Sequence, residues 1–234
     1  MKKILFIGFV ITMILFQSCL SVIVSKYDLN SKTPKLEKID VPEKEVYFLG
    51  VAHIAKEEFY ENMKVIIEEL QEKDFIFYLE SVSELDKKNI SIDTFSIKKI
   101  RKLTDLDISL KYSESQNPYL QKLRKKYDLI DQPKYDFFAL KNYKRVDYSY
   151  AELINFYEAK FGKIELDSCD VNTEIRSIYK CKSGNTTERK NFTDEIILDV
   201  RNRLIADSIT KSNDKKIVVI YGKAHLKGIK QYLN

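Results

Sequence analysis

The chain has 234 residues, of which 44% are hydrophobic and 12% aromatic, enough to bury one sizeable core. Its 40 lysines and arginines exceed its 35 aspartates and glutamates, giving a net charge of +5. The excess is spread along the chain without a dense basic block, which excludes a typical nucleic-acid-binding surface.

The N-terminus has the pattern of an export signal, in which Lys2 and Lys3 precede an apolar stretch at 4–16. Shortly after this stretch a small residue precedes Cys19, as in a bacterial lipoprotein box, so Cys19 is a candidate lipidation site. The apolar character resumes at 20–24, and the whole stretch is then long enough for an uncleaved signal anchor. Both alternatives predict an exported protein tethered to a membrane of the bacterial cell envelope.

Three segments follow from this pattern. Residues 1–24 are predicted to be the signal peptide or signal anchor, and 25–45, with two prolines, a polar linker. Residues 46–234 are predicted to form a single domain.

Two cysteines remain if Cys19 carries lipid, namely Cys169 and Cys181. An even number in an oxidising compartment favours a disulfide between them. Two buried free thiols are the alternative.

The first part of the domain reads as a βαβ unit. Short apolar runs at 46–51 and 75–79 are typical of buried strands, and 56–73 between them has the periodicity of an amphipathic helix. The two strands should therefore be parallel and the crossover right-handed. The expected fold is α/β with a mainly parallel sheet.

The middle of the chain is expected to form a helical cap over the functional edge of the sheet. Helices are predicted at 118–129 and at 149–161, the second with a capping box formed by Ser149 and Glu152 and a stop at Gly162. Many aromatic residues of this region are expected to be plain core. Residues 169–193 are read as a polar loop that the disulfide pins.

The last long helix is predicted to begin near Thr193. At 100° per residue Arg201 falls within its apolar stripe, whereas Asn202 and Arg203 fall outside it. A buried arginine needs an anion, so Arg201 should meet Glu80, another carboxylate at the strand ends or an anionic substrate group. Alternatively, it lies at the edge of the stripe and reaches water.

The two histidines of the chain occur in matched contexts, Gly50-Val-Ala-His53 and Gly222-Lys-Ala-His225, each directly after an apolar run. Ligands of open α/β sheets bind beyond the carboxyl ends of the strands, where glycine allows close approach of the backbone. We therefore expect His53, His225 and Glu80 to form one site, with Gly50 and Gly222 beside the bound group. Two unrelated loop histidines are the alternative.

These residues permit two mechanisms. In the first, His53, His225 and Glu80 bind a divalent metal that activates water. In the second there is no metal; one histidine acts as general base, Glu80 orients it and Arg201 stabilises the developing negative charge.

The order and spacing of four short motifs resemble the TraB/GumN/Tiki superfamily. They are the two Gly-x-x-His motifs, Leu-Glu80, and Arg201-Asn-x-x-Ile205-Ala, in which Ile205 stands where the family has methionine. The resemblance covers both ends of the domain, and the middle matches no known pattern.

The resemblance implies a split α/β sheet with its site at the strand ends. The likeness to Tiki-like members of the superfamily implies a membrane-tethered peptidase that depends on manganese or cobalt, with zinc as a further candidate. Other relatives, such as the ChaN lipoproteins, bind haem, and erythromycin esterases are distant kin. The expected function is thus a hydrolase acting on a peptide or other amide or ester bond, with Glu80, Arg201, His53 and His225 as catalytic residues. A lipoprotein that binds haem or another small ligand is the alternative.

Overall fold

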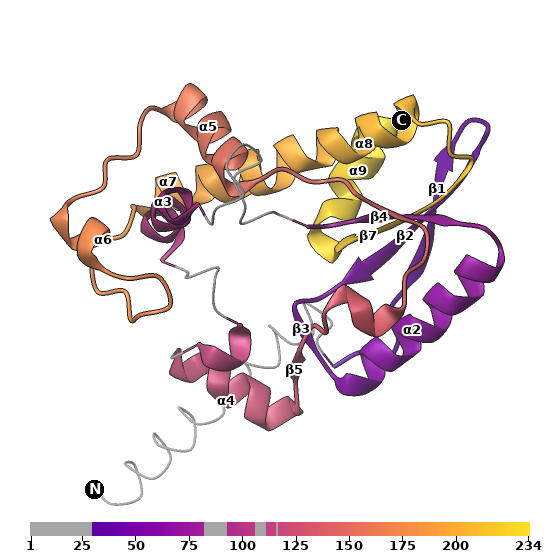
Figure 1. Cartoon of the computed structure of the whole chain (residues 1–234), viewed down its shortest axis with the longest axis horizontal. Coiled ribbons are helices and arrows are strands. Elements are labelled where there is room, and N and C mark those ends of the chain that lie inside the picture. Colours follow the sequence, from indigo (N-terminus) through magenta and orange to yellow (C-terminus); the bar gives the residue numbers. More distant parts are fainter. Residues whose placement is uncertain (1–29, 82–92, 106–110, 116) are drawn as a thin grey trace, which may run out of the picture.

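The computed structural model describes residues 30–81, 93–105, 111–115 and 117–234 (Figure 1). A five-stranded sheet has the order β1-β2-β7-β4-β6, in which β1 is antiparallel to β2 and the other neighbours are parallel. A separate antiparallel pair joins β3 to β5. The strands are β1 (Leu36–Val41), β2 (Lys44–Val51), β3 (Ile54–Ala55), β4 (Ile76–Leu79), β5 (Ile130–Asp131), β6 (Tyr143–Arg145) and β7 (Lys216–Gly222).

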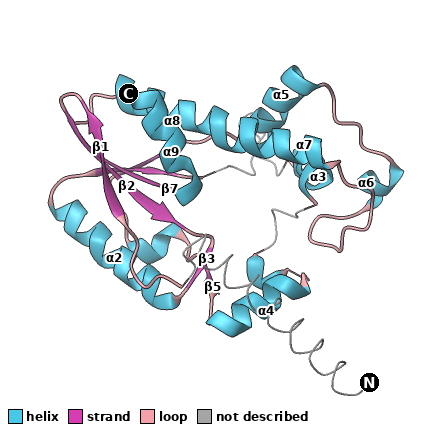
Figure 2. Cartoon of the chain, turned by 180° about the vertical axis from the view of Figure 1, so that it is seen from behind, coloured by secondary structure: helices cyan, strands magenta, loops and turns pink. Residues whose placement is uncertain are grey.

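Helices cover both faces of this sheet, and a further group of helices lies to one side of it (Figure 2). The α-helices are α2 (Glu57–Glu72), α3 (Thr94–Thr104), α4 (Pro118–Tyr127), α5 (Tyr150–Phe161), α6 (Ser168–Asn172), α7 (Thr186–Asn191), α8 (Arg201–Lys211) and α9 (Leu226–Leu233). Short 3₁₀ turns occupy Tyr112–Glu114, Tyr135–Phe138 and Lys223–His225, and a π-helical stretch occupies Phe192–Val200. The mainly parallel α/β fold and the β2-α2-β4 unit are as the sequence predicts.

The two faces of the sheet carry separate cores. Helix α2 covers one face and buries Phe59, Met63 and Ile67 against β2, β4 and β7. Helices α8 and α9 cover the other face with Ile205, Ile209 and Ile229 (Figure 1). Because β7 lies between β2 and β4 and is covered on both faces, its residues from Ile217 to Tyr221 are fully buried.

The prediction that 25–45 is only a linker is wrong for its second half. Leu36–Val41 forms the edge strand β1, which a tight turn at Pro42-Glu43 folds back onto β2. The turn is possible because Glu43 takes a left-handed backbone conformation, with φ of 59°. Ile39 is buried whereas Leu36 is exposed, so this strand covers the sheet edge with little apolar surface.

A cap of helices lies beside the sheet rather than on its faces. Helices α3 and α5 pack together with the π-helical stretch around Leu153, Tyr157 and Phe192. Helix α5 has the predicted capping box of Ser149 and Glu152 and ends at Gly162, where φ is 97°.

Two boundaries in the cap differ from the prediction. The long helix begins at Thr186 with Asn185 as its N-cap, rather than near Thr193, because Asn185 and Glu188 form a capping box of their own. The stretch predicted as a polar loop from 169 to 193 also contains α6 and α7. Helix α7, the π-helical stretch and α8 run on continuously and connect the cap to the sheet (Figure 1).

The structure joins Cys169 and Cys181 by a disulfide. Closing a loop with a separation of 12 residues should stabilise the fold by about 3 kcal/mol in the chain-entropy model. Thiol titration of the unfolded, unreduced chain should therefore find no reactive group beyond Cys19. Two additional thiols per chain would contradict the disulfide.

The predicted signal segment and the Cys19 lipidation site lie outside the described residues. Within the described part of the chain, no helix combines the length and the hydropathy needed to cross a bilayer.

Candidate active site

The carboxyl ends of the parallel strands carry the polar residues of the site. Glu80 follows β4 directly, and its backbone N–H donates a hydrogen bond of 3.0 Å to the carbonyl of Ile220 in β7. His225 lies in the turn after β7, and Asp147 lies two residues beyond β6. Strands distant in sequence thus bring these side chains to one edge of the sheet.

Arg201 lies at the centre of this group, only 3% exposed. Its Nη2 donates to Glu80 Oε1 at 2.7 Å and to Asp147 Oδ2 at 2.8 Å, while Nε donates to Asp147 Oδ1 at 2.9 Å. The prediction that Arg201 is buried against a carboxylate is confirmed. Burial lowers the pKa of the guanidinium, but the hydrogen bonds that it donates to Asp147 and the charge of Glu80 outweigh this effect and raise the pKa, so Arg201 stays charged.

Asp147 is a functional residue that the sequence analysis did not single out. Its side chain is fully buried and forms a bidentate ion pair with Arg201. It also accepts hydrogen bonds from the backbone N–H groups of Ser81 and Tyr148, each with a donor–acceptor distance of 2.9 Å. Only the short strand β6, whose side chains are exposed, precedes it, so no buried apolar run marked the position. A carboxylate near a strand end was the only available signal.

Glu80 is held by several donors. Its Oε2 accepts the backbone N–H of Gly222 at 2.6 Å, and its backbone carbonyl accepts the hydroxyl of Tyr135 at 2.6 Å. Burial alone raises the pKa of this carboxyl, but the charge of Arg201 and the hydrogen bond that Arg201 donates hold the pKa below its ordinary value. Glu80 is therefore a fixed, ionised carboxylate near neutral pH.

The imidazole of His225 lies behind Arg201 and is 3% exposed. Its Nδ1 is 2.8 Å from Asn202 Oδ1, and its Nε2 is 3.4 Å from Arg201 Nη1 and 3.9 Å from Glu80 Oε1. Because an amide oxygen only accepts, this arrangement puts the proton on Nδ1 and the lone pair on Nε2.

Asn202 was expected outside the apolar stripe but is only 5% exposed. The reason is Gly228 in α9, where an added Cβ would lie 2.0 Å from Asn202 Nδ2. The missing side chain of Gly228 lets α9 approach α8 and leaves room for Asn202 to reach His225. Arg203 is exposed, as predicted, with its side chain 63% accessible.

Burial, with a further contribution from Arg201, lowers the pKa of His225 to about 4. NMR titration of the two imidazoles should therefore show one that stays neutral until pH about 4 and that is lost in His225→Gln. In the unfolded chain this group takes up its proton near pH 6.5. Stability from the neutral imidazole is thus present above pH 6.5 and lost as the pH falls toward 4.

That loss should amount to about 3 kcal/mol, the free energy of keeping the imidazole neutral over this window. Urea unfolding as a function of pH measures it, and His225→Gln is the matched control, because carboxylates that titrate in acid are common to both proteins. Equal acid dependence in the two proteins would contradict a buried neutral His225.

His53 lies at the end of β2 beside the separate β3–β5 pair. Its backbone carbonyl accepts the N–H of Gln132 at 2.9 Å, and its ring stacks on Tyr112 with centroids 5.8 Å apart and an interplanar angle of 16°. Its positive charge would lower the pKa of both Glu80 and His225, so it belongs to the same electrostatic group.

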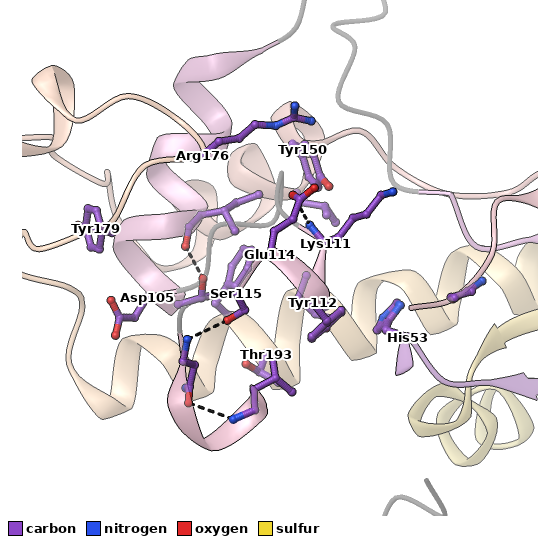
Figure 3. A pocket seen from close by; sticks show the side chains of 18 of the residues that line it. His53, Asp105, Lys111, Tyr112, Glu114, Ser115, Tyr150, Arg176, Tyr179 and Thr193 are labelled. Carbon is purple, nitrogen blue, oxygen red and sulfur yellow. Dashed lines mark hydrogen bonds between the residues drawn. The ribbon is translucent and has the colours of Figure 1, made fainter. Parts of the chain in front are cut away.

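A cavity of about 1040 Å³ opens from this group toward the helical cap. His53, Glu80, Arg201 and Tyr135 are among the residues that line it, and Tyr112 stands beside His53 (Figure 3). His225 does not line the cavity, and its Nε2 faces Arg201 and Glu80 instead.

The two glycines expected beside a bound group do not line this cavity. Gly222 has a different role, because its N–H holds Glu80 and an added Cβ would lie 3.4 Å from Glu80 Oε2. An added Cβ at Gly50 would lie 2.8 Å from Lys223 Cγ, so Gly50 lets the two Gly-x-x-His motifs pack against each other.

The predicted metal ligands are not gathered around a common centre. Among the described residues, no three His, Cys, Asp or Glu side chains are placed to hold one ion. Arg201 contacts Glu80 Oε1 at 2.7 Å and lies 3.4 Å from His225 Nε2, so a divalent ion shared by Glu80 and His225 would have to displace a guanidinium. This donor set does not fit a metal as it stands.

The fold and site define an α/β protein with a large cavity at the carboxyl ends of its parallel strands. Comparisons of the chain with protein-family models, with curated proteins and with solved structures found no match.

Proposed function

We propose that this protein is a membrane-tethered hydrolase that cleaves a peptide or another amide or ester bond outside the cytoplasm. The observation that carries the proposal is the ionised Glu80–Arg201 pair, which lies beside His53 at the end of a large cavity. A charged pair with a neighbouring imidazole supplies the base and the charge stabilisation that hydrolysis of a carbonyl compound needs.

Each residue has a distinct role in this proposal. His53, which lines the cavity, accepts a proton from the attacking water and returns it to the leaving amine or alkoxide as the bond to the carbonyl carbon breaks. Glu80 orients the imidazole electrostatically. Arg201 stabilises the negative charge that develops on the carbonyl oxygen. Asp147 and His225 do not face the cavity and position Arg201, one through its two oxygens and the other through Nε2.

The geometry favours the form of the mechanism without metal, because Arg201 already contacts Glu80, which a metal would need as a ligand. The form with manganese, cobalt or zinc implied by the TraB/GumN/Tiki resemblance predicts that Arg201 moves when the ion binds. Chelation separates the two, since it abolishes only the metal-dependent activity.

The test is hydrolysis of a set of synthetic peptides and esters by the purified full chain, read by mass spectrometry. We expect cleavage that survives dialysis against EDTA and is lost in His53→Ala. Cleavage that disappears with EDTA and returns with manganese or cobalt would establish the metal-dependent form. No cleavage by any preparation, with or without added metal, would contradict the hydrolase.

Binding of haem is the second candidate, because tyrosines are common among the residues that line the cavity. A tyrosine hydroxyl can serve as an axial ligand of haem iron. The tyrosines in the lining of the cavity are Tyr112, Tyr135, Tyr150 and Tyr179. Titration with haemin should then give a Soret shift that Tyr112→Phe changes and Glu80→Gln leaves intact.

A further inference from the structure

We propose that the loop closed by the Cys169–Cys181 disulfide is the specificity-determining wall of the cavity, where Ile178 and Tyr179 contact an apolar part of the ligand. This assignment rests on the proposed function in so far as it calls that ligand a substrate.

The position of the loop supports the assignment. Ile178 and Tyr179 line the same cavity as His53 and Arg201, although they come from a different part of the fold. Figure 3 shows His53 and Tyr112 at one end of the cavity and Tyr179 with Asp105 at the other. A ligand whose reacting bond lies at His53 must therefore extend across the cavity to reach the disulfide loop.

The size of the cavity points the same way. Pockets for small ligands enclose roughly 300–1000 Å³. At about 1040 Å³ this cavity lies at the upper limit of that range, while His53 lies at only one of its ends. A minimal ester or dipeptide would leave the end near the disulfide loop unfilled.

The chemistry of the far end favours apolar groups. Ile100, Leu153 and Phe192 are among the residues that line the cavity, and all three belong to the buried core of the cap. The charged residues near the loop, Asp105 and Arg176, have opposite signs and add no net charge. Ile178, which is 53% exposed, is the aliphatic side chain that the loop itself presents to the cavity, and it favours an apolar part of the ligand.

The loop is held rigidly in place, which specificity requires. The hydroxyl of Tyr179 donates to Asp170 Oδ1 at 2.7 Å, and Asp170 is 1% exposed and also paired with Lys102. The guanidinium of Arg101, itself fully buried, lies 4.8 Å from the centre of the Tyr179 ring.

Arg101 also fixes the backbone of the loop. Its Nη2 and Nη1 donate to the carbonyls of Thr173 and Glu174 at 2.7 and 2.8 Å. Together with the disulfide, these contacts tie the loop to α3 at several points. The wall is therefore formed before a ligand binds, and little ordering is needed on binding.

The disulfide segment offers a matched pair of test positions. Ile178 and Val171 are both exposed aliphatic residues, at 53% and 50%, but only Ile178 lines the cavity. We therefore compare Ile178→Glu with Val171→Glu in the full chain, using the uncharged apolar fluorophore N-phenylnaphthylamine as the probe. Fluorescence titration needs no catalysis, so it is independent of the hydrolysis assay.

The wild-type chain and Val171→Glu should bind the probe alike, and Ile178→Glu should bind it roughly tenfold more weakly, as expected for loss of a buried aliphatic contact. If hydrolysis is found, Ile178→Glu should raise KM for long apolar peptides without changing kcat. Absence of binding by the wild-type chain, or equal effects of the two substitutions, would overturn the assignment. Selective loss in Ile178→Glu without any hydrolysis would support the wall and refute only the hydrolase.

Discussion

Arg201→Ala is expected to lower the free energy of unfolding by about 3–5 kcal/mol, the typical cost of removing one partner from a buried ion pair. The substitution leaves the carboxylates of Glu80 and Asp147 without the guanidinium that contacts both. The side chain of Asp147 is fully buried, so its charge loses its main partner at a poorly solvated position. Urea unfolding of the two proteins measures the difference.

Arg203→Ala is the matched control, two residues along the same helix. Arg203 also pairs with an aspartate, Asp199 at 2.7 Å, but its side chain is 63% exposed. Exposed pairs contribute about 0–1 kcal/mol, so this variant should unfold almost as the wild type does. Small and equal effects of the two substitutions would show that Arg201 is not held as the structure describes.

His53→Ala and His225→Ala are each expected to reduce hydrolysis strongly, by about 10²-fold to 10⁴-fold. His53 loses the proposed base directly, whereas His225 acts through Arg201, whose Nη1 lies 3.4 Å from His225 Nε2. The double variant should cost little more than either single change, because groups that act as one unit are strongly non-additive. kcat/KM of the four proteins completes this cycle.

Glu80→Gln should cause a comparable loss, since it removes the charge that Arg201 and His53 face. Glu195→Gln is its control, an identical chemical change at a half-exposed carboxylate that pairs with Lys160 away from the cavity. Fully additive losses in the histidine cycle, or equal activities of the two glutamine variants, would rule out a single catalytic centre.

The βαβ unit and the buried arginine were predictable because their signals are local. The apolar runs of β2, β4 and β7 and the stripe of α2 show in any short window of the sequence, and parallel pairing follows from their order. Arg201 was predictable from helical periodicity alone, since its place in the apolar stripe required a buried anion. The matched Gly-x-x-His motifs likewise marked both strand ends.

Tertiary structure decided which groups meet at those ends. Asp147 reaches Arg201 only because β6 pairs with β4, and β6 is too short and too exposed to be read as a strand. Asn202 is buried by α9 through the space left at Gly228, which helical periodicity within α8 does not describe. The edge strand β1 was likewise not predictable from its own residues, because it forms by pairing with β2.

The two histidines also separate what the sequence determines from what the tertiary structure decides. By itself the sequence determined that each follows a buried strand and a glycine. Only the folded chain decided that His53 lines the cavity beside Tyr112, while His225 is buried behind Arg201 with a pKa lowered to about 4. The physical reason is that exposure and ionisation depend on neighbours from distant segments, which identical local motifs do not specify.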